Sequence, residues 1–530
     1  MVGDGAACAD LARVSAAARA DACQCPAVAL AGSLSAKDAE KGTHKILKLF
    51  GLSLNVKISK AELLVSGEPL RIAYLKPSDY LAKLLGYCAE AVWGREQRPQ
   101  QRCQSFWKAY YAHHPGHEVY AKFGLSDLGN VVPILLHGDE GTGSKKQPVA
   151  IVNWQTPWGP PGKKASRVAK ESDFNKCSLC ASKKSAVSSC CKVPEAWADR
   201  KLDAGMSLVQ EDFDELLTQF PSTTGHSAFS RHLVFVLPTH LLKKGTEVLD
   251  GMLGACAEDL RSLFSTGVMV GSTKYYGALV GCKGDSKWHA TVAKLLRSYT
   301  RLGEVNCKPI CAECLGGDPL FPFEQTGDDA KWVETLYESV PWDPAFLGPL
   351  ESIPFDIHEP ARKYKRDLLH VFKIGLGRDV AGGIMTLLSR FFRWFDAPGD
   401  SISLDNRLKR MHARFSLFCL ADGRCPHLRC FTKDSMHMPR VDSYAFTNTK
   451  GSDTMLLMLW LKLECNLALA SHRDHPRKDL LQVSSQACAA SIEMFRVCYS
   501  HGLFLPRPCM VTLRDEMLRV TRGYNYLAKG

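Results

Sequence analysis

The sequence predicts a mixed α/β protein with a mainly helical C-terminal region. Apolar, β-branched runs of strand length occur between residues 131 and 282, and helical patterns lie among them. From about residue 360 onward helical periodicity dominates, broken by a loop at 397–403 and a turn-rich segment at 421–453. The 530 residues are 45% hydrophobic and 23% charged, which is typical of a soluble globular protein with roughly two to four domains.

The elements between residues 131 and 300 follow a specific order. We expect strands at 131–136, 149–154, 232–237 and 275–282, a helix at 246–266 before the fourth strand, and a helix at 286–300 after it. Thr246 and Ser286 are the expected caps of the two helices, and Gly267 is the expected stop of the first. This order follows that of a ribonuclease H-like core, in which the first and fourth strands lie side by side.

The other segments define the expected domains. Residues 129–303 form the ribonuclease H-like core, with 156–231, rich in Pro, Gly, Ser, Lys and Cys, as an insertion. Residues 1–40 are expected to be poorly ordered, and 41–128 to form a small N-terminal α/β region with Ser78 or Asp79 as a helix cap. Residues 304–355 would hold a cysteine knuckle and a connection, and 356–530 a helical region.

Charge and cysteine content bear on partners and compartment. The formal net charge of +12 suits a polyanionic partner. The 21 cysteines occur without a secretory signal, which favours a reducing, intracellular compartment where thiols stay free or bind metal. Lys462 and Glu464 interrupt the longest apolar stretch, 454–470, so we expect no membrane span.

The Gly-rich loop that starts at Gly138 allows three interpretations. It nearly matches a phosphate-binding loop, but Lys145 comes one residue late and Pro148 opens a strand where that motif needs a helix. A plain hairpin turn is the second interpretation. The third is a catalytic hairpin in which Asp139, at the end of the first strand, and Asp285, at the end of the fourth, share divalent metals such as Mg²⁺ or Mn²⁺.

The third acidic position is less specific. Asp367 precedes His370 by three residues near a helix start, so both side chains could contact one metal or one phosphate, or the histidine could simply be bonded within the fold. Glu464 stands alone in an apolar helix and therefore needs a partner, either a functional site or an arginine.

Cysteine spacing suggests structural zinc. Cys307-x3-Cys311-x2-Cys314 has ligand-like spacing, with Cys282 or a distant histidine as the fourth ligand. The group at Cys177, Cys180, Cys190 and Cys191 is a second candidate. Free thiols are the alternative for both groups.

Basic clusters lie at 145–146, 163–170, 362–366 and 407–414. They could follow a phosphate backbone or form an ordinary solvated surface. The neighbouring aromatic residues Tyr364, Phe391 and Trp394 could stack on bases or belong to the core.

These motifs together resemble the catalytic region of DNA transposases with an Asp-Asp-Asp/Glu site. The resemblance rests on HGDEGTG after a strand, GCKGD after a later strand, the CxxxCxxC knuckle and the DLLH block, and spans roughly residues 130–400. It is strongest to the CACTA and Plavaka-like group, and extends to transposon-derived multi-copy families of protists.

The resemblance implies roles for named residues. Asp139 and Asp285 would be the first two metal-binding acids, Asp367 and His370 the D-x-x-H element, and Glu464 the best candidate for the last acid. The implied activity is metal-dependent cleavage and strand transfer of DNA by a nuclear or otherwise intracellular protein, with a homo-oligomer as a further option. The alternative is a decayed or domesticated copy that binds DNA, or acts as a scaffold, without cleaving.

Overall fold

The computed structural model describes most of the chain outside the expected insertion. The described residues are 8–21, 24–35, 39–50, 54–94, 98–142, 147–158, 230–242, 246–299, 309–327, 329–440, 443, 445–500 and 503–529. Lys145, Cys307, the basic cluster 163–170 and the cysteine group 177–191 therefore lie outside the described residues.

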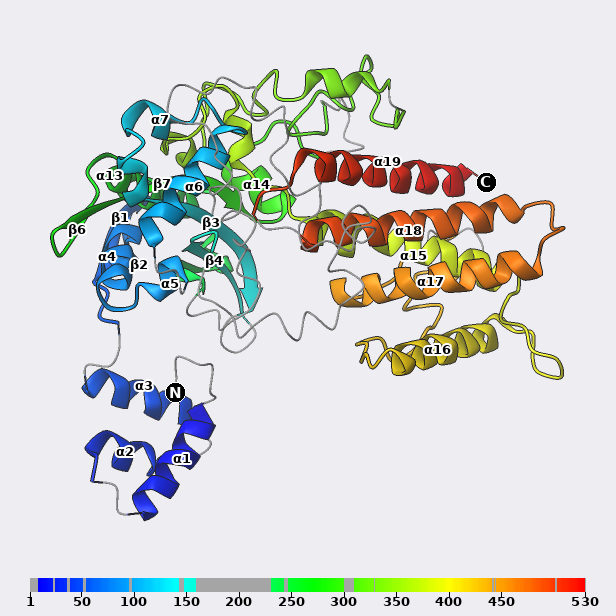
Figure 1. The fold of residues 1–530 in the computed structure, drawn as a ribbon, viewed down its shortest axis with the longest axis horizontal. Coiled ribbons are helices and arrows are strands. Elements are labelled where there is room, and N and C mark those ends of the chain that lie inside the picture. Colours follow the sequence, from blue (N-terminus) through cyan, green and yellow to red (C-terminus); the bar gives the residue numbers. More distant parts are fainter. Residues whose placement is uncertain are drawn as a thin grey trace.

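A five-stranded mixed sheet lies at the centre of the first half (Figure 1). Its strands run in the order β5-β4-β3-β7-β6. β3 pairs antiparallel with β4 and parallel with β7, β4 pairs antiparallel with β5, and β6 pairs antiparallel with β7. The strands are β3 (Val131–Thr142), β4 (Pro148–Gln155), β5 (His232–Pro238), β6 (Val268–Val270) and β7 (Thr273–Lys283). The four expected strands are confirmed, and β6 is a short addition. However, β3 runs six residues past its expected end at 136, so Asp139 lies inside this strand and not at its end.

Helix α13 (Glu247–Ser265) covers one face of the sheet, because its apolar stripe is buried against β7. The chain leaves this helix through Gly267, which has a φ of +73°, as expected of a glycine stop. Thr246 is at the cap position but its side chain makes no capping bond. The next helix, α14 (Ser286–Val292), is capped by Asp285 and not by Ser286, and it ends earlier than expected.

The residues before the sheet share its core. β1 (Ile58–Val65) and β2 (Glu68–Leu75) form a hairpin, and α4 (Pro77–Tyr87), α5 (Glu90–Trp93), α6 (Pro99–Tyr111) and α7 (Glu118–Lys122) follow. Trp107 of α6 is fully buried in the same hydrophobic cluster as the strands, so the elements from β1 to α7 share the core of the sheet. Helix α4 begins at Pro77 after Lys76, and neither Ser78 nor Asp79 caps it. Ser78 instead bonds Asp259 of α13.

The N-terminal segment contains helices where we expected little order. These are α1 (Cys8–Ala20), α2 (Pro26–Ala31) and α3 (Ala39–Leu49), which contact one another. The segment is rich in alanine, the residue with the highest helix propensity. Ala12, Ala31 and Ala39 are buried between the helices, so small side chains permit close packing.

The C-terminal half is helical and has a second hydrophobic core (Figure 1). Its helices are α15 (Gly377–Thr386), α16 (Leu404–Ala421), α17 (Gly451–Ser471), α18 (Lys478–Ser500) and α19 (Arg507–Lys529), with π-helical turns η9 (Leu369–Leu376) and η10 (Leu387–Phe391). Shorter elements elsewhere are α12 (Thr239–Leu242) and the 3₁₀ turns η2 (Asp127–Asn130), η6 (Lys331–Thr335), η7 (Pro349–Ser352) and η8 (Pro360–Lys363). The expected interruptions near 397–403 and 421–453 are observed.

Helix α17 is long and apolar enough to cross a membrane by length and composition alone. In the structure, 56% of its most apolar window is buried inside the protein, and the helix packs against α15 and α18. A core helix of a soluble protein passes the same test.

Candidate functional site

Three neighbouring segments run in the same direction at one place in the sheet. In β3, Leu136 is level with Cys282 of the parallel strand β7. On the other side of β7, Tyr364 forms a parallel bridge with Cys282, and the Lys365 amide donates to the Cys282 carbonyl at 2.8 Å. Leu136, Cys282 and Tyr364 therefore form one row across three adjacent segments.

The three aspartates singled out in the sequence each lie three residues beyond this row. They are Asp139 after Leu136, Asp285 after Cys282 and Asp367 after Tyr364. Beyond this row the three segments differ, because β3 continues as a strand to Thr142, β7 ends at Lys283, and Tyr364 is an isolated bridge. Burial lowers the pKa of His137 and of His289; Asp139 and Asp367 partly offset this for His137, and Asp285 and Asp367 partly offset it for His289.

Two of these carboxylates also have partners in the protein. An Asp285 oxygen accepts the Trp288 amide at 2.6 Å, which caps α14. Asp367 lies 2.6 Å from Nδ1 of His370 and accepts the Leu369 amide at 2.8 Å. His370 is thus bonded within the fold, as the second of its two interpretations states.

The faces of β3 separate two groups of polar residues. Side chains alternate along a strand, so Asp139 lies on the face of His137, and Glu140 on the face of Gly138. Glu140, not Asp139, lines a pocket of about 260 Å³ together with Asp285 and Trp288. Lys287 lies 4.0 Å from a Glu140 oxygen. Sequence reasoning missed Glu140, although strand alternation from the buried Leu136 could have indicated it.

A row of polar side chains lies on the Asp139 face. His137 Nδ1 is 3.3 Å from the Asn153 amide nitrogen, and Lys283 donates to Gln155 at 3.1 Å. Burial lowers the pKa of both His137 and Lys283, and Asp367 partly offsets this for each. This end of the sheet thus carries cations as well as acids, but Asp139, Asp285 and Asp367 do not form a group of ligand atoms within 4.8 Å of one another among the described residues.

Two glycines let an indole ring lie across the strand ends. A Cβ at Gly138 would stand 2.0 Å from the ring of Trp288, and a Cβ at Gly284 would stand 2.5 Å from it. Each glycine directly precedes one of the aspartates, Asp139 or Asp285. The packing of the Trp288 ring therefore requires glycine at both positions, whatever the chemical role of the aspartates that follow.

We expect Gly138→Ala to destabilise the protein by about 1–3 kcal/mol, because the new methyl must displace the packed indole. Chemical denaturation would measure the change. Gly141→Ala, on the same strand, is the matched control, since its Cβ would meet Ile151 at 3.3 Å and requires only a small shift. In a Trp288→Ala background, Gly138→Ala should cause little loss of stability. An equal loss of stability in both backgrounds would show that contact with the Trp288 ring is not the reason for the glycine.

Glu464 lies away from the strands that carry the aspartates. It is 3% exposed in the core of the helical region, accepts the indole N–H of Trp394 and of Trp460, and pairs with Arg414 at 2.7 Å. The arginine-pair alternative accounts for it, and its assignment as a last metal-binding acid is corrected. Its partners come from α16, α17 and the turn before α16, which sequence spacing could not reveal.

The cysteine pair forms a tight turn stabilised by amide donors. The Glu313 amide donates to Cys311 Sγ at 3.4 Å, and the Gly316 amide donates to Cys314 Sγ at 3.3 Å. A hydrogen bond from Cys314 lowers the pKa of Cys311 to about 6 and raises that of Cys314. Cys282, the suggested fourth zinc ligand, is buried in β7, where burial raises its pKa to about 12. The zinc prediction stays a prediction.

Among the described residues, one group of metal-ligand side chains is tightly gathered: His114, Asp356 and Glu359, whose ligand atoms lie within 4.8 Å of one another. His114 Nδ1 is 3.2 Å from Asp356, and its Nε2 is 3.4 Å from the Lys365 ammonium. Arg362 pairs with Glu359 at 3.0 Å. Arg362 thus already pairs with one of the two acids and Lys365 lies against the histidine, which disfavours a metal here.

Most cations of the two described large basic clusters pair with acids. In 362–366, Lys363 is buried against Glu351 at 3.0 Å and Arg366 pairs with Glu313 at 2.8 Å. In 407–414, Arg407 and Arg410 pair with Asp396 and Asp400. Several of these cations are therefore already neutralised by acids of the same chain, which reduces the charge free to follow a phosphate backbone.

Of the three neighbouring aromatic residues, two are engaged inside the fold and one is half exposed. Tyr364 is buried, with its hydroxyl 2.5 Å from Glu351, and Trp394 bonds Glu464. Phe391 is half exposed.

The phosphate-loop alternative lacks its helix. After the Gly-rich loop the chain enters β4 at Pro148, so no helix N-terminus follows to face a phosphate among the described residues. Comparison with protein-family models, with curated proteins and with solved structures found no match to this chain.

Proposed function

We propose that this chain is a transposase-derived protein with a ribonuclease H-like core that cuts and joins DNA, with Asp139, Asp285 and Asp367 as its metal-binding acids. The observation that carries the proposal is the row Leu136–Cys282–Tyr364, because all three acids lie three residues beyond it. The strand order β5-β4-β3-β7, with β3 parallel to β7, is that expected of the core. Nuclear location and self-association belong to the same proposal.

The donor chemistry suits a hard divalent cation. Carboxylate oxygens are preferred ligands of Mg²⁺ and Mn²⁺. Asp139, inside β3, is exposed, and Asp285, just after β7, is partly exposed. When bound, such ions stabilise the charge that develops on a phosphodiester during cleavage. Asp285 has one oxygen on the α14 cap, so its other oxygen is the one that would bind metal.

Neighbouring residues would position the acids and the DNA. His370 holds the Asp367 carboxylate through its 2.6 Å contact. Lys283, held by Gln155, lies within electrostatic reach of Asp367 and supplies a cation for a phosphate at the same edge. This combination of acids and a cation supports phosphodiester chemistry over nucleotide hydrolysis.

We expect the purified full chain to nick DNA in Mg²⁺ or Mn²⁺, and Asp139→Asn, Asp285→Asn and Asp367→Asn each to lower the rate about a hundredfold or more. Loss of a metal-binding acid removes several kcal/mol of charge stabilisation, and 1.36 kcal/mol is a factor of ten. Asparagine also caps helices, so Asp285→Asn should fold. Gel analysis of labelled duplexes would measure cleavage.

Asp474→Asn, a change at an exposed loop residue, is the matched control and should cleave at the wild-type rate. Cleavage at the wild-type rate in all three variants would show that these acids do not bind the catalytic metal. If the wild-type protein cleaved no DNA in either metal, the proposed enzyme activity would be wrong.

A second candidate is a non-cleaving DNA-binding protein on the same fold. It is favoured by the existing partners of two acids, since Asp285 caps a helix and Asp367 bonds His370. In that case DNA binding should weaken steeply with added salt, remain unchanged in Asp139→Asn, and occur without cleavage.

A further inference from the structure

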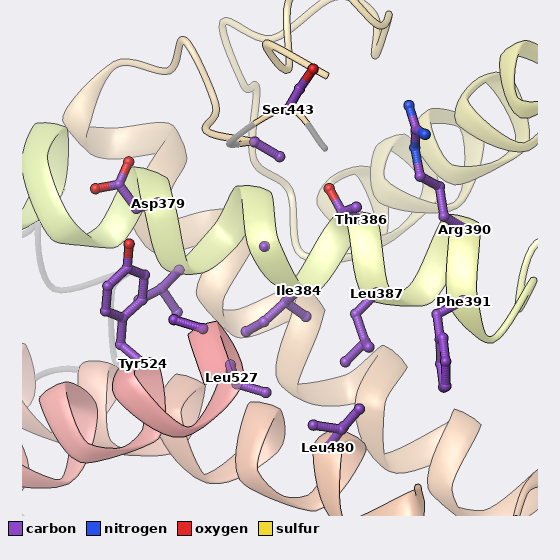
Figure 2. A pocket seen from close by; sticks show the side chains of 14 residues that line it. Asp379, Ile384, Thr386, Leu387, Arg390, Phe391, Ser443, Leu480, Tyr524 and Leu527 are labelled. Carbon is purple, nitrogen blue, oxygen red and sulfur yellow. The ribbon is translucent and has the colours of Figure 1, made fainter. Parts of the chain in front are cut away.

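The helical half contains a cavity of about 500 Å³ between α15, η10, α18 and α19 (Figure 2). Its wall is mainly apolar, with Ile384, Leu387, Leu480 and Leu527 among the lining residues. No cysteine of the described residues lines this cavity. The thiols that can react with a small molecule therefore lie elsewhere in the described part of the chain.

Two of these thiols, Cys311 and Cys314, lie in direct contact. The Cys314 thiol donates a hydrogen bond to the Cys311 sulfur. Cys311 is partly exposed, whereas Cys314 is only 4% exposed. The chain therefore presents one sulfur to solvent and holds the second sulfur against it inside the protein. This is the arrangement that thiol–disulfide exchange needs, because one accessible thiol is attacked by a neighbour in a second step.

Each of the two sulfurs is held by a backbone amide. The Glu313 amide donates to Cys311 Sγ at 3.4 Å, and the Gly316 amide donates to Cys314 Sγ at 3.3 Å. The charge of Arg366 also acts on Cys311. Hydrogen bonds and positive charge beside a sulfur stabilise the thiolate, which is the form that attacks a disulfide.

The turn that carries the cysteines is anchored to a neighbouring segment of the chain. The Tyr337 amide donates to the Glu313 carbonyl at 2.7 Å, and the Leu315 amide donates to Thr335 Oγ1 at 3.0 Å. These partners lie outside the turn, so they fix its backbone from a second segment. The two sulfurs therefore already face each other before a disulfide forms.

We propose that Cys311 and Cys314 are a thiol–disulfide exchange site whose oxidant is a small disulfide such as glutathione disulfide. The Cys311 thiolate attacks one sulfur of the oxidant, so that a mixed disulfide forms and one small thiolate leaves. Cys314 then attacks Cys311, so that the protein disulfide closes and the second small thiolate leaves. The protein dithiol is oxidised, the small disulfide is reduced, and the two protons of the dithiol end on the two small thiols.

Incubation of the purified full chain with oxidised glutathione, followed by alkylation of free thiols and peptide mass spectrometry, tests the proposal. Wild type should form a Cys311–Cys314 disulfide at least about tenfold in excess of the mixed disulfide, because two linked groups have an effective concentration of about millimolar or more. Dithiothreitol should restore both thiols. Cys425→Ser removes an exposed thiol of the helical half and is the matched control, which should form the same disulfide.

Two further variants separate the roles of the two sulfurs. Cys314→Ser should accumulate glutathione on Cys311, because the second sulfur that would release it is missing. Cys311→Ser should take up at least about tenfold less glutathione on Cys314, since that sulfur is buried and exchange depends on access. The proposal would be overturned by absence of the disulfide in wild type, by equal glutathione uptake in the two variants, or by zinc that is bound to the purified wild type and keeps both thiols reduced.

Discussion

Acidification from pH 6.5 to pH 4 should unfold the sheet-containing half of the protein while the helical half stays protected. Three histidines of the first half, His117, His232 and His289, are buried, and burial lowers the pKa of each to about 4. The unfolded chain binds protons at these sites below its ordinary value near 6.5, and the folded chain does so only near 4. Stability is therefore complete above pH 6.5 and is lost as the pH falls toward 4.

The expected size of this effect is large. A shift of this size corresponds to about 3 kcal/mol for one histidine, and folded domains are typically stable by only about 5–15 kcal/mol. Protonation of all three histidines can therefore remove most of the free energy of unfolding. Hydrogen exchange measured by mass spectrometry along a pH series would show whether exchange in β3, β4 and β7 rises before exchange in α17 and α18.

His232 gives the sharpest single-residue test of this acid sensitivity. Its ring packs 4.5 Å from Trp154 and 5.0 Å from Tyr80, and neither ring nitrogen has a hydrogen-bond partner among the described residues. His232→Phe keeps a ring in place and removes the titrating group, so it should lower the midpoint of acid unfolding and raise stability at neutral pH by about 1–3 kcal/mol.

The control is His437→Phe, which changes an exposed histidine stacked on Phe446 in the helical half. It should leave the midpoint unchanged. If His232→Phe also left the midpoint unchanged, burial of neutral histidine would not be the cause of acid unfolding.

Local patterns predicted the strands and helices of the sheet region well. The runs that became β3, β4, β5 and β7 are apolar and β-branched, and such runs form strands wherever a sheet can bury them. The order of these elements also predicted that the first and fourth strands would be neighbours, and β3 pairs with β7. The cap of α14 was displaced by one residue, because Asp285 accepts the bond expected of Ser286.

Features that depend on long-range contacts were not predictable in the same way. Tyr364 and Lys365 lie beside β7 as an isolated bridge, so no strand pattern marks the segment that carries Asp367. The cluster 362–366 resembled a free basic surface, because the acids that neutralise it, Glu351, Glu313 and Glu359, become neighbours only in the fold. Spacing identifies residue types that can do chemistry, whereas partners decide whether they are free to do it.

We expect Glu464→Leu to cost about 3 kcal/mol of stability, an effect confined to the helical half. The change removes the acceptor of two indole N–H groups and the counter-ion of Arg414. Breaking a buried ion pair costs about 3–5 kcal/mol, and the lower end applies because the Arg414 side chain is 38% exposed and can regain water. Glu258→Leu, at an exposed position of α13, should stay within about 0.5 kcal/mol of wild type.

The milder variant Glu464→Gln separates packing from catalysis. A glutamine keeps one carbonyl acceptor for an indole but turns an amide toward the other donors, so stability should fall by about 1–2 kcal/mol. Metal-dependent cleavage should survive, because the acids proposed to bind metal lie at the end of the sheet and Glu464 belongs to the other core. If Glu464→Gln abolished cleavage without a loss of stability, Glu464 would be a metal-binding acid after all. If it lowered stability but kept cleavage, Asp367 would remain the proposed third acid.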